Sequence, residues 1–393
     1  MAIRKKILIL LLCCITILAF LLQPKVAKAS TNGASIAGFD KFSSTSYILM
    51  EANSGKVLVN FNEEERMPVA SICKLMTSLL TLERLDSGEI SLDDMVLVSE
   101  HAAEVEGSQA FLDAGSSYTV GELLKSVVVA SANDSARALA EHIAGSEELF
   151  VTMMNDRAKE LGMNNTNYTN ATGLTTADQY STAYDTCLIL REINKHETYS
   201  KFAKIWMDNL THPSGRVTEL VNTNRLIRYY EPCLDGKTGY TDEAGYCLSS
   251  VASKNGLKLV AVTLHCKDSA SRFFESMKLY DYGFANFENK VVLAKADFVQ
   301  DIATNNAKSN TARVGISQDL SYLLCKNEAM ASEIVYNIPA KISAPMCAGD
   351  KVGSIAVMCN GDKVAEVDVV LLDDIARQGM LDIFDKIFTK WTA

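Results

Sequence analysis

The chain has 393 residues, of which 48% are hydrophobic and 22% are charged. This composition is typical of a globular protein with a sizeable core, it excludes collagen-like, coiled-coil and largely disordered chains, and the length favours two domains over one. The formal net charge of −10 at pH 7 argues against a nucleic-acid-binding protein, which needs basic patches.

The first 29 residues are predicted to be a secretory signal peptide. Three cationic residues at positions 4–6 precede an apolar run over 7–22, and Ala-Lys-Ala at 27–29 matches an A-x-A cleavage site. The alternative is an uncleaved membrane anchor, although an apolar run of about 16 residues is shorter than the roughly 20 that span a bilayer. Cleavage removes five cationic residues and no acid, so the mature chain has a formal charge of −15.

Ten cysteines are present, and two of them lie in the predicted signal peptide. No C-x-x-C pair occurs, so neither a zinc site nor a thioredoxin-like motif is indicated. An exported chain can form disulfides. Several of the eight remaining cysteines lie in apolar runs, where a thiol packs as a small hydrophobe, so buried free thiols are favoured over a disulfide framework.

The elements predicted up to residue 285 combine helices with hairpins. A hairpin is predicted over 46–61, and a helix begins after Pro68 and ends near Gly88. Apolar runs at 246–253 and 258–265 flank Asn255-Gly256, a strong hairpin signal. Further helices are predicted over 119–130, 133–144, 146–161, 181–195 and 269–282. This order predicts an α/β (α+β) domain with an antiparallel sheet flanked by helices, and not repeating βαβ units.

From residue 286 the pattern changes to short β-branched runs separated by Gly, Asn and Asp, which predicts a small all-β C-terminal domain. The expected domains are a signal peptide at 1–29, the α+β domain at 30–285, a β-rich domain at 286–371 and a tail at 372–393. Within the tail, residues 375–391 are amphipathic and are interpreted as an in-plane membrane helix, a helix packed on the β domain or a frayed end.

The first polar motif is Ser71-x-x-Lys74, at the start of the helix predicted after Pro68. Residues three apart on a helix share a face, so the Lys74 amine can reach the Ser71 hydroxyl. A serine needs an adjacent base, and a desolvated or cation-crowded lysine can be neutral and take its proton. The pattern arises about once by chance in a chain of this length, so taken alone it favours a solvated serine with a surface lysine.

The second motif is Ser131-Ala132-Asn133, at the break between two predicted helices. A serine there can relay a proton, and an asparagine can both donate to and accept from a peptide. An ordinary helix end followed by an Asn N-cap explains the motif better when it stands alone.

The third motif is Lys237-Thr238-Gly239, which leads toward the strand predicted from Tyr246. Lysine and threonine can hold a carboxylate, and glycine lets a substrate backbone approach closely. The alternative is an ordinary turn before a strand.

In this order and in these contexts, the three motifs are the signature of penicillin-binding proteins and serine β-lactamases. The chain resembles the D-alanyl-D-alanine carboxypeptidases, the low-molecular-mass penicillin-binding proteins of peptidase family S11. The resemblance extends to residues 67–71, 173–174, 180–185 and 237–246 and covers nearly the whole chain. Family members often carry His where Gln179 stands and Pro where Ala171 stands, two departures that are expected not to touch the chemistry.

The resemblance implies a serine-type D-Ala-D-Ala carboxypeptidase that removes the terminal D-Ala from peptidoglycan stem pentapeptides through an acyl-enzyme. Arg272 lies where the family tends to place an arginine that helps to hold the substrate carboxylate. The catalytic residues implied are Ser71, Lys74, Ser131 and Asn133. The substrate-binding residues implied are Lys237, Thr238, Gly239, Tyr240 and Arg272.

The resemblance also implies that no metal or organic cofactor is needed, that β-lactam antibiotics are covalent inhibitors, and that the enzyme acts at the outer face of the cell membrane. The tail at 375–391 is then a candidate membrane contact. The alternatives are a serine β-lactamase on the same scaffold and a non-catalytic β-lactam or wall-binding sensor. The extra β domain argues against the first and the three intact motifs against the second. The five histidines show no paired spacing, which makes a metal hydrolase a poor fit.

Overall fold

The computed structural model describes residues 31–32, 36–327, 331–380 and 382. The predicted signal peptide and most of the predicted amphipathic tail, including Phe384, Ile387, Phe388 and Trp391, lie outside these residues. Within the described ranges, no helix combines the length and the hydropathy needed to cross a membrane.

A six-stranded sheet in the order β1-β3-β2-β10-β9-β8 forms the centre of the N-terminal unit. Its strands are antiparallel, apart from the short β1, which pairs in parallel with β3. The bounds are β1 (Thr31–Asn32), β2 (Ser46–Glu51), β3 (Val57–Phe61), β8 (Cys233–Thr241), β9 (Gly245–Lys254) and β10 (Leu257–Cys266).

Both hairpins predicted from the turn residues are present. The β9–β10 turn consists of Asn255 and Gly256 with φ of 51° and 78°, the two positive values that a tight turn matching the strand twist requires. The β2–β3 hairpin occupies the range predicted for it.

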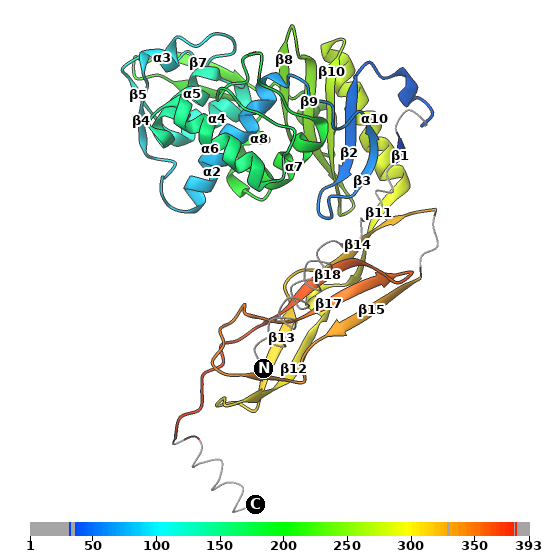
Figure 1. Cartoon of the computed structure of the whole chain (residues 1–393). Coiled ribbons are helices and arrows are strands. Elements are labelled where there is room, and N and C mark those ends of the chain that lie inside the picture. Colours follow the sequence, from blue (N-terminus) through cyan, green and yellow to red (C-terminus); the bar gives the residue numbers. More distant parts are fainter. Residues whose placement is uncertain (1–30, 33–35, 328–330, 381, 383–393) are drawn as a thin grey trace, which may run out of the picture.

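Helices cover both faces of this sheet (Figure 1). Tyr47 and Leu49 of β2 face the core that contains α10 (Ser269–Asn286), whereas Ile48 and Met50 face the larger core of the helical group. Because strand side chains alternate between faces, a strand with both faces buried carries a continuous apolar run, as β2 does from Tyr47 to Met50. The helical group includes α2 (Lys74–Asp86), α3 (Glu100–Ala103), α4 (Val120–Ala130), α5 (Asn133–Ala144), α6 (Glu147–Glu160), α7 (Ala183–Ile193) and α8 (Glu197–Ala203).

The C-terminal unit is all-β, as predicted, and begins where α10 ends. A six-stranded sheet in the order β15-β17-β18-β13-β12-β16 packs with the β11–β14 pair around its own apolar core. Ile375, the first residue of the predicted tail segment, is buried in that core and bridges Met346. The strands are β11 (Phe287–Leu293), β12 (Val299–Asn305), β13 (Thr311–Ile316), β14 (Leu320–Cys325), β15 (Ser332–Asn337), β16 (Lys341–Ser343), β17 (Lys351–Cys359) and β18 (Asp362–Leu371).

The eight cysteines of the described ranges are free thiols, and six of them are buried. Burial raises the pKa of the Cys73 thiol to about 12, so this neighbour of Lys74 is packed and unreactive at neutral pH. Only Cys347 among the eight is exposed.

Candidate active site

Ser71 lies in a short 3-10 helix, η3 (Ala70–Cys73), and Lys74 is the first residue of α2, so the two stand at a helix junction and not within one α-helix as predicted. The Nζ of Lys74 is 2.8 Å from the Oγ of Ser71 and donates a hydrogen bond of 2.6 Å to the carbonyl of Thr172. Ser71 itself is half-buried, which leaves its hydroxyl open to a substrate.

Burial sets the protonation of Lys74. The side chain is fully buried, and this desolvation lowers the pKa of its amine to about 7, against the opposing effects of Cys73 and Asp134. A neutral amine that donates one N–H to the Thr172 carbonyl still has its lone pair for the Ser71 hydroxyl proton. The arrangement can therefore deprotonate Ser71.

The second and third motifs meet at one hydrogen bond. Ser131 terminates α4 in the left-handed conformation, with φ of 62°, which turns its hydroxyl out of the helix. The buried Lys237 amine donates to the Ser131 Oγ over 2.6 Å. Burial, with the nearby charges of Lys74 and Arg272, holds the pKa of Lys237 well below its usual value. Residues from α4 and β8 thus converge near the Ser71–Lys74 pair.

Asn133 presents an unused acceptor. Its Nδ2 donates to the carbonyl of Glu106, and its backbone N–H donates to Ser108 over 2.7 Å. The residue is only 3% exposed, and its buried Oδ1 has no hydrogen-bond partner among the residues that the structure describes. Since an unmade hydrogen bond at a buried acceptor costs about 1–3 kcal/mol, this atom is suited to accept from a bound peptide N–H.

The Lys-Thr-Gly motif lies inside the strand β8, which pairs with β9, the strand that contains Tyr246. The alternative of an ordinary turn before a strand is therefore wrong. A Cβ atom on Gly239 would be 2.4 Å from the Val69 carbonyl oxygen and 3.4 Å from the Ser71 nitrogen. Gly239 therefore allows β8 to lie directly against η3, next to the backbone nitrogen of Ser71.

On its other side, η3 packs equally closely against the backbone of Gly173. A Cβ atom on Gly173 would be 2.1 Å from the Ala70 carbonyl oxygen, and Ala70 itself has a φ of 47°. A left-handed non-glycine residue costs about 1–2 kcal/mol. The backbone before Ser71 is therefore strained and is held on both sides by close packing.

The remaining predicted residues surround this centre less directly. Thr238 donates to the Thr223 hydroxyl over 2.8 Å. The Tyr240 side chain is 49% exposed and donates to Asp242, so only its backbone approaches Ser71. Arg272 donates to the carbonyls of Gly239 and Cys247, and its buried Nε has no partner.

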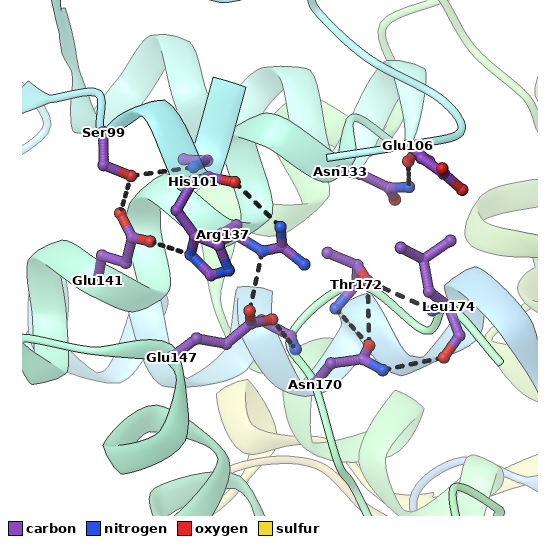
Figure 2. A network of polar contacts seen from close by, with 12 residues as sticks. Ser99, His101, Glu106, Asn133, Arg137, Glu141, Glu147, Asn170, Thr172 and Leu174 are labelled. Carbon is purple, nitrogen blue, oxygen red and sulfur yellow. Dashed lines mark hydrogen bonds and ion pairs between the residues drawn. The ribbon is translucent and has the colours of Figure 1, made fainter. Parts of the chain in front are cut away.

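No role was predicted for the segment 170–174, whose Thr172 carbonyl binds Lys74. The side chain of Asn170 accepts from the backbone N–H groups of Thr172 and Gly173 and donates to the Leu174 carbonyl (Figure 2). Gln179, expected to have no part in the chemistry, is buried and accepts from the Thr169 and Asn170 backbones. Gln179 therefore supports the backbone before Thr172 and not the reacting groups themselves, so that expectation stays a prediction.

Family models match most of the chain. A model described as D-alanyl-D-alanine carboxypeptidase matches residues 31–268, and one described as penicillin-binding protein 5, C-terminal domain, matches residues 287–377. The chain belongs to the D-alanyl-D-alanine carboxypeptidase family. Membership confirms the family resemblance and identifies the chain as a hydrolase of the carboxypeptidase type.

Individual relatives agree with this family. The chain is 38% identical over 350 residues to the D-alanyl-D-alanine carboxypeptidase DacF of Bacillus subtilis (strain 168). The aligned region covers 88% of this chain and 90% of that protein. It is 31% identical over 359 residues to the carboxypeptidase DacC of Escherichia coli (strain K12), with 88% of each chain covered.

Solved structures confirm the predicted fold class. Penicillin binding protein 5 from Haemophilus influenzae aligns with a TM-score of 0.67 at 29% identity, covering 86% of this chain and 98% of that one. A peptidoglycan synthesis regulatory factor (PBP3) from Streptococcus pneumoniae aligns with a TM-score of 0.72 at 26% identity, covering 85% and 99%. The penicillin-binding fold and the added β domain are therefore shared over nearly the whole described chain.

Proposed function

We propose that this carboxypeptidase removes the terminal D-Ala from peptidoglycan stem pentapeptides through an acyl-enzyme on Ser71. The observation that supports this most directly is the 2.8 Å contact between Ser71 Oγ and a buried lysine amine whose pKa is lowered to about 7. A serine hydroxyl beside a largely neutral amine is an activated nucleophile at physiological pH.

In the proposed acylation, the Lys74 amine takes the Ser71 proton while Oγ attacks the carbonyl between the two D-Ala residues. The N–H groups of Ser71 and Tyr240 bind the developing oxyanion, an effect typically of about 3–4 kcal/mol per donor. The proton taken by Lys74 is passed through Ser131, which is hydrogen-bonded to Lys237, to the leaving amine as the C–N bond breaks, so Ser131 ends protonated. Water then hydrolyses the ester and regenerates the serine.

Substrate binding uses the groups around this centre. Lys237, Thr238 and Arg272 hold the free carboxylate of the terminal D-Ala, and the unpartnered Oδ1 of Asn133 accepts a peptide N–H. Gly239 allows the peptide backbone to lie along β8. β-Lactams present the same carboxylate and a strained amide, and we propose that they acylate Ser71 and leave it slowly.

We also propose the predicted division into a catalytic unit at 30–285 and a β-rich unit at 286–371, and a site of action outside the cytoplasm, where peptidoglycan is exposed. The separate apolar core of the β-rich unit supports the division.

The test is release of D-Ala from a stem pentapeptide by the wild-type chain and by Ser71→Ala, together with mass spectrometry after exposure to benzylpenicillin. We expect release and a single adduct on Ser71 from the wild type, and neither from the variant. A folded wild-type chain that forms no adduct would contradict the proposal. Fast nitrocefin hydrolysis would favour a β-lactamase, and an adduct without peptide turnover would favour a sensor.

A further inference from the structure

The backbone of residues 170–172 belongs to no helix or strand, yet side chains satisfy all of its carbonyls. The three consecutive carbonyl oxygens accept from the side chains of η3 and α2. The donors in chain order are Cys73 Sγ to Asn170 at 3.4 Å, Thr77 Oγ1 to Ala171 at 2.6 Å, and Lys74 Nζ to Thr172 at 2.6 Å. The proposed general base is therefore one of three side chains that hold this segment.

The middle residue of the segment, Ala171, is also held through its N–H, by a carboxylate. Glu147, the first residue of α6, accepts from the Ala171 N–H through Oε1 over 2.9 Å. Its other oxygen, Oε2, forms an ion pair of 2.8 Å with Nε of Arg137 on α5 (Figure 2). Glu147 is only 9% exposed.

Arg137 is anchored at its far end as well. Its Nη1 donates over 3.0 Å to the carbonyl of His101 in α3, whose ring contacts Glu141 on α5 at 2.7 Å. A carboxylate loses hydration on burial and needs a fixed cation to remain charged, and a helix N-terminus adds a favourable field. Glu147 is therefore fixed between Arg137 and the start of α6, and its Oε1 has a fixed direction in which to accept.

We propose that Glu147, fixed by Arg137, is a positioning residue for Lys74 in the acylation of Ser71. The inference rests on the proposed function. Glu147 holds the Ala171 N–H, which belongs to the Asn170–Ala171 peptide, and the two carbonyls that follow are those of Ala171, bound by Thr77, and Thr172, bound by Lys74. If the Asn170–Ala171 peptide turns, the backbone after it shifts, the Thr172 carbonyl moves off the amine, and the lone pair of Lys74 no longer points at the Ser71 proton.

Hydrogen-bond direction makes this step sensitive. Proton transfer needs the donor and acceptor atoms at about 2.6–3.2 Å and well aligned, and misplacement by about 1 Å can cost a hundredfold in rate. Substrate binding does not need Lys74 to be aligned. Loss of Glu147 should therefore reduce the rate constant of acylation and leave the non-covalent binding constant nearly unchanged.

The experiment compares two double variants that avoid an unpaired buried charge. Glu147→Ala/Arg137→Met removes the acceptor for Ala171, whereas Glu147→Gln/Arg137→Met restores a neutral acceptor of the same reach. Glu148→Ala, an exposed acid next along the same helix, is the control. Stopped-flow acylation by nitrocefin or benzylpenicillin separates the binding constant from the rate constant, and thermal unfolding shows that each variant is folded at the assay temperature.

We expect the alanine variant to acylate at least tenfold more slowly, with a binding constant within threefold of wild type, and we expect the glutamine variant to recover to within about threefold. Equal rates in the two double variants, whether both unchanged or both reduced, would overturn the inference. An unacylated wild type would instead contradict the proposed function itself.

Glu147→Asp gives a second test that keeps the charge. Because aspartate retains a carboxylate beside Arg137, we expect the variant to fold. The shorter side chain withdraws that carboxylate by one methylene from the Ala171 N–H. This variant must also acylate more slowly at an unchanged binding constant. A wild-type rate from Glu147→Asp would contradict the positioning role even if the alanine variant failed to fold.

Discussion

Gly239 and Val69 meet backbone to backbone, so closely that a methyl group on Gly239 would lie 2.4 Å from the Val69 carbonyl oxygen. This contact fastens β8, which carries Lys237, to the 3-10 turn that carries Ser71. The distance between the two motifs is therefore set by main-chain packing and not by long side chains, which accounts for the rigidity needed at an oxyanion site.

The first prediction concerns this contact. Gly239→Ala should reduce the acylation rate at least a hundredfold, because β8 must move away from η3 to make room for the methyl group. The measurement is acylation by benzylpenicillin followed by mass spectrometry. Gly256→Ala, which meets nothing within 4 Å but has a φ of 78°, is the control. It should lower stability by about 1 kcal/mol without slowing acylation, and similar rates for both variants would contradict the prediction.

The second prediction follows from the pKa of about 7 that burial gives Lys74. The neutral base accumulates as the pH rises through 7, so the acylation rate should climb about tenfold per pH unit below 6 and level off above 8. Lys74→Met should lower the rate by about 10²–10⁴. Acylation rates measured between pH 5 and 9 check this. A flat profile would show that another group deprotonates Ser71.

The third prediction concerns Asp235, a fully buried carboxyl two residues before Lys237 in β8. Burial raises its pKa from 3.8 to about 7, and its Oδ2 has no partner. The folded chain therefore holds this proton more tightly than the unfolded chain does. Its contribution to stability falls as the pH rises from about 4 to 7 and stays low above 7.

Asp235→Asn should remove this loss of stability at high pH, because an amide does not titrate. We expect the variant to be more stable than wild type at pH 8, by at most about 4 kcal/mol, since one pKa unit corresponds to about 1.4 kcal/mol, and to differ little at pH 4. Urea unfolding at the two pH values measures the difference, with the exposed Asp297→Asn as control. A variant less stable than wild type at pH 8 would show that the carboxylate form is the one the fold needs.

The fourth prediction tests the domain division. A chain that starts at Ser30 and ends at Asn286 should fold and acylate at the wild-type rate, because every described residue of the C-terminal apolar core lies beyond that end, from Val292 onward. A modest loss of thermal stability is expected from the removal of Phe287 and Leu323, which pack against the α10 core. An insoluble fragment, or one acylated more than tenfold slower, would argue that the two units depend on each other.

The sequence predicted the parts of this structure that local pattern determines. The Asn255-Gly256 hairpin, the helix break at Ser131 and the all-β C-terminal unit each follow from residue types close together in the chain. The position of Lys237 inside β8 was missed, because Asp235 to Gly239 contains little β-branched or apolar material and its pairing with β9 provides the strand. The role of Gln179 was missed for a related reason: the contacts that give it importance are tertiary, with a backbone ten residues away.

The irregular segment at 170–172 has a consequence for protein engineering. Its shape is encoded only in part by its own Asn170 and otherwise by partners on η3 and α2, by Glu147 and by Gln179. A loop grafted here from a relative will adopt the donor's geometry only if these partners are transplanted with it, and sequence exchange at this position should be designed as a set spanning positions 73–179.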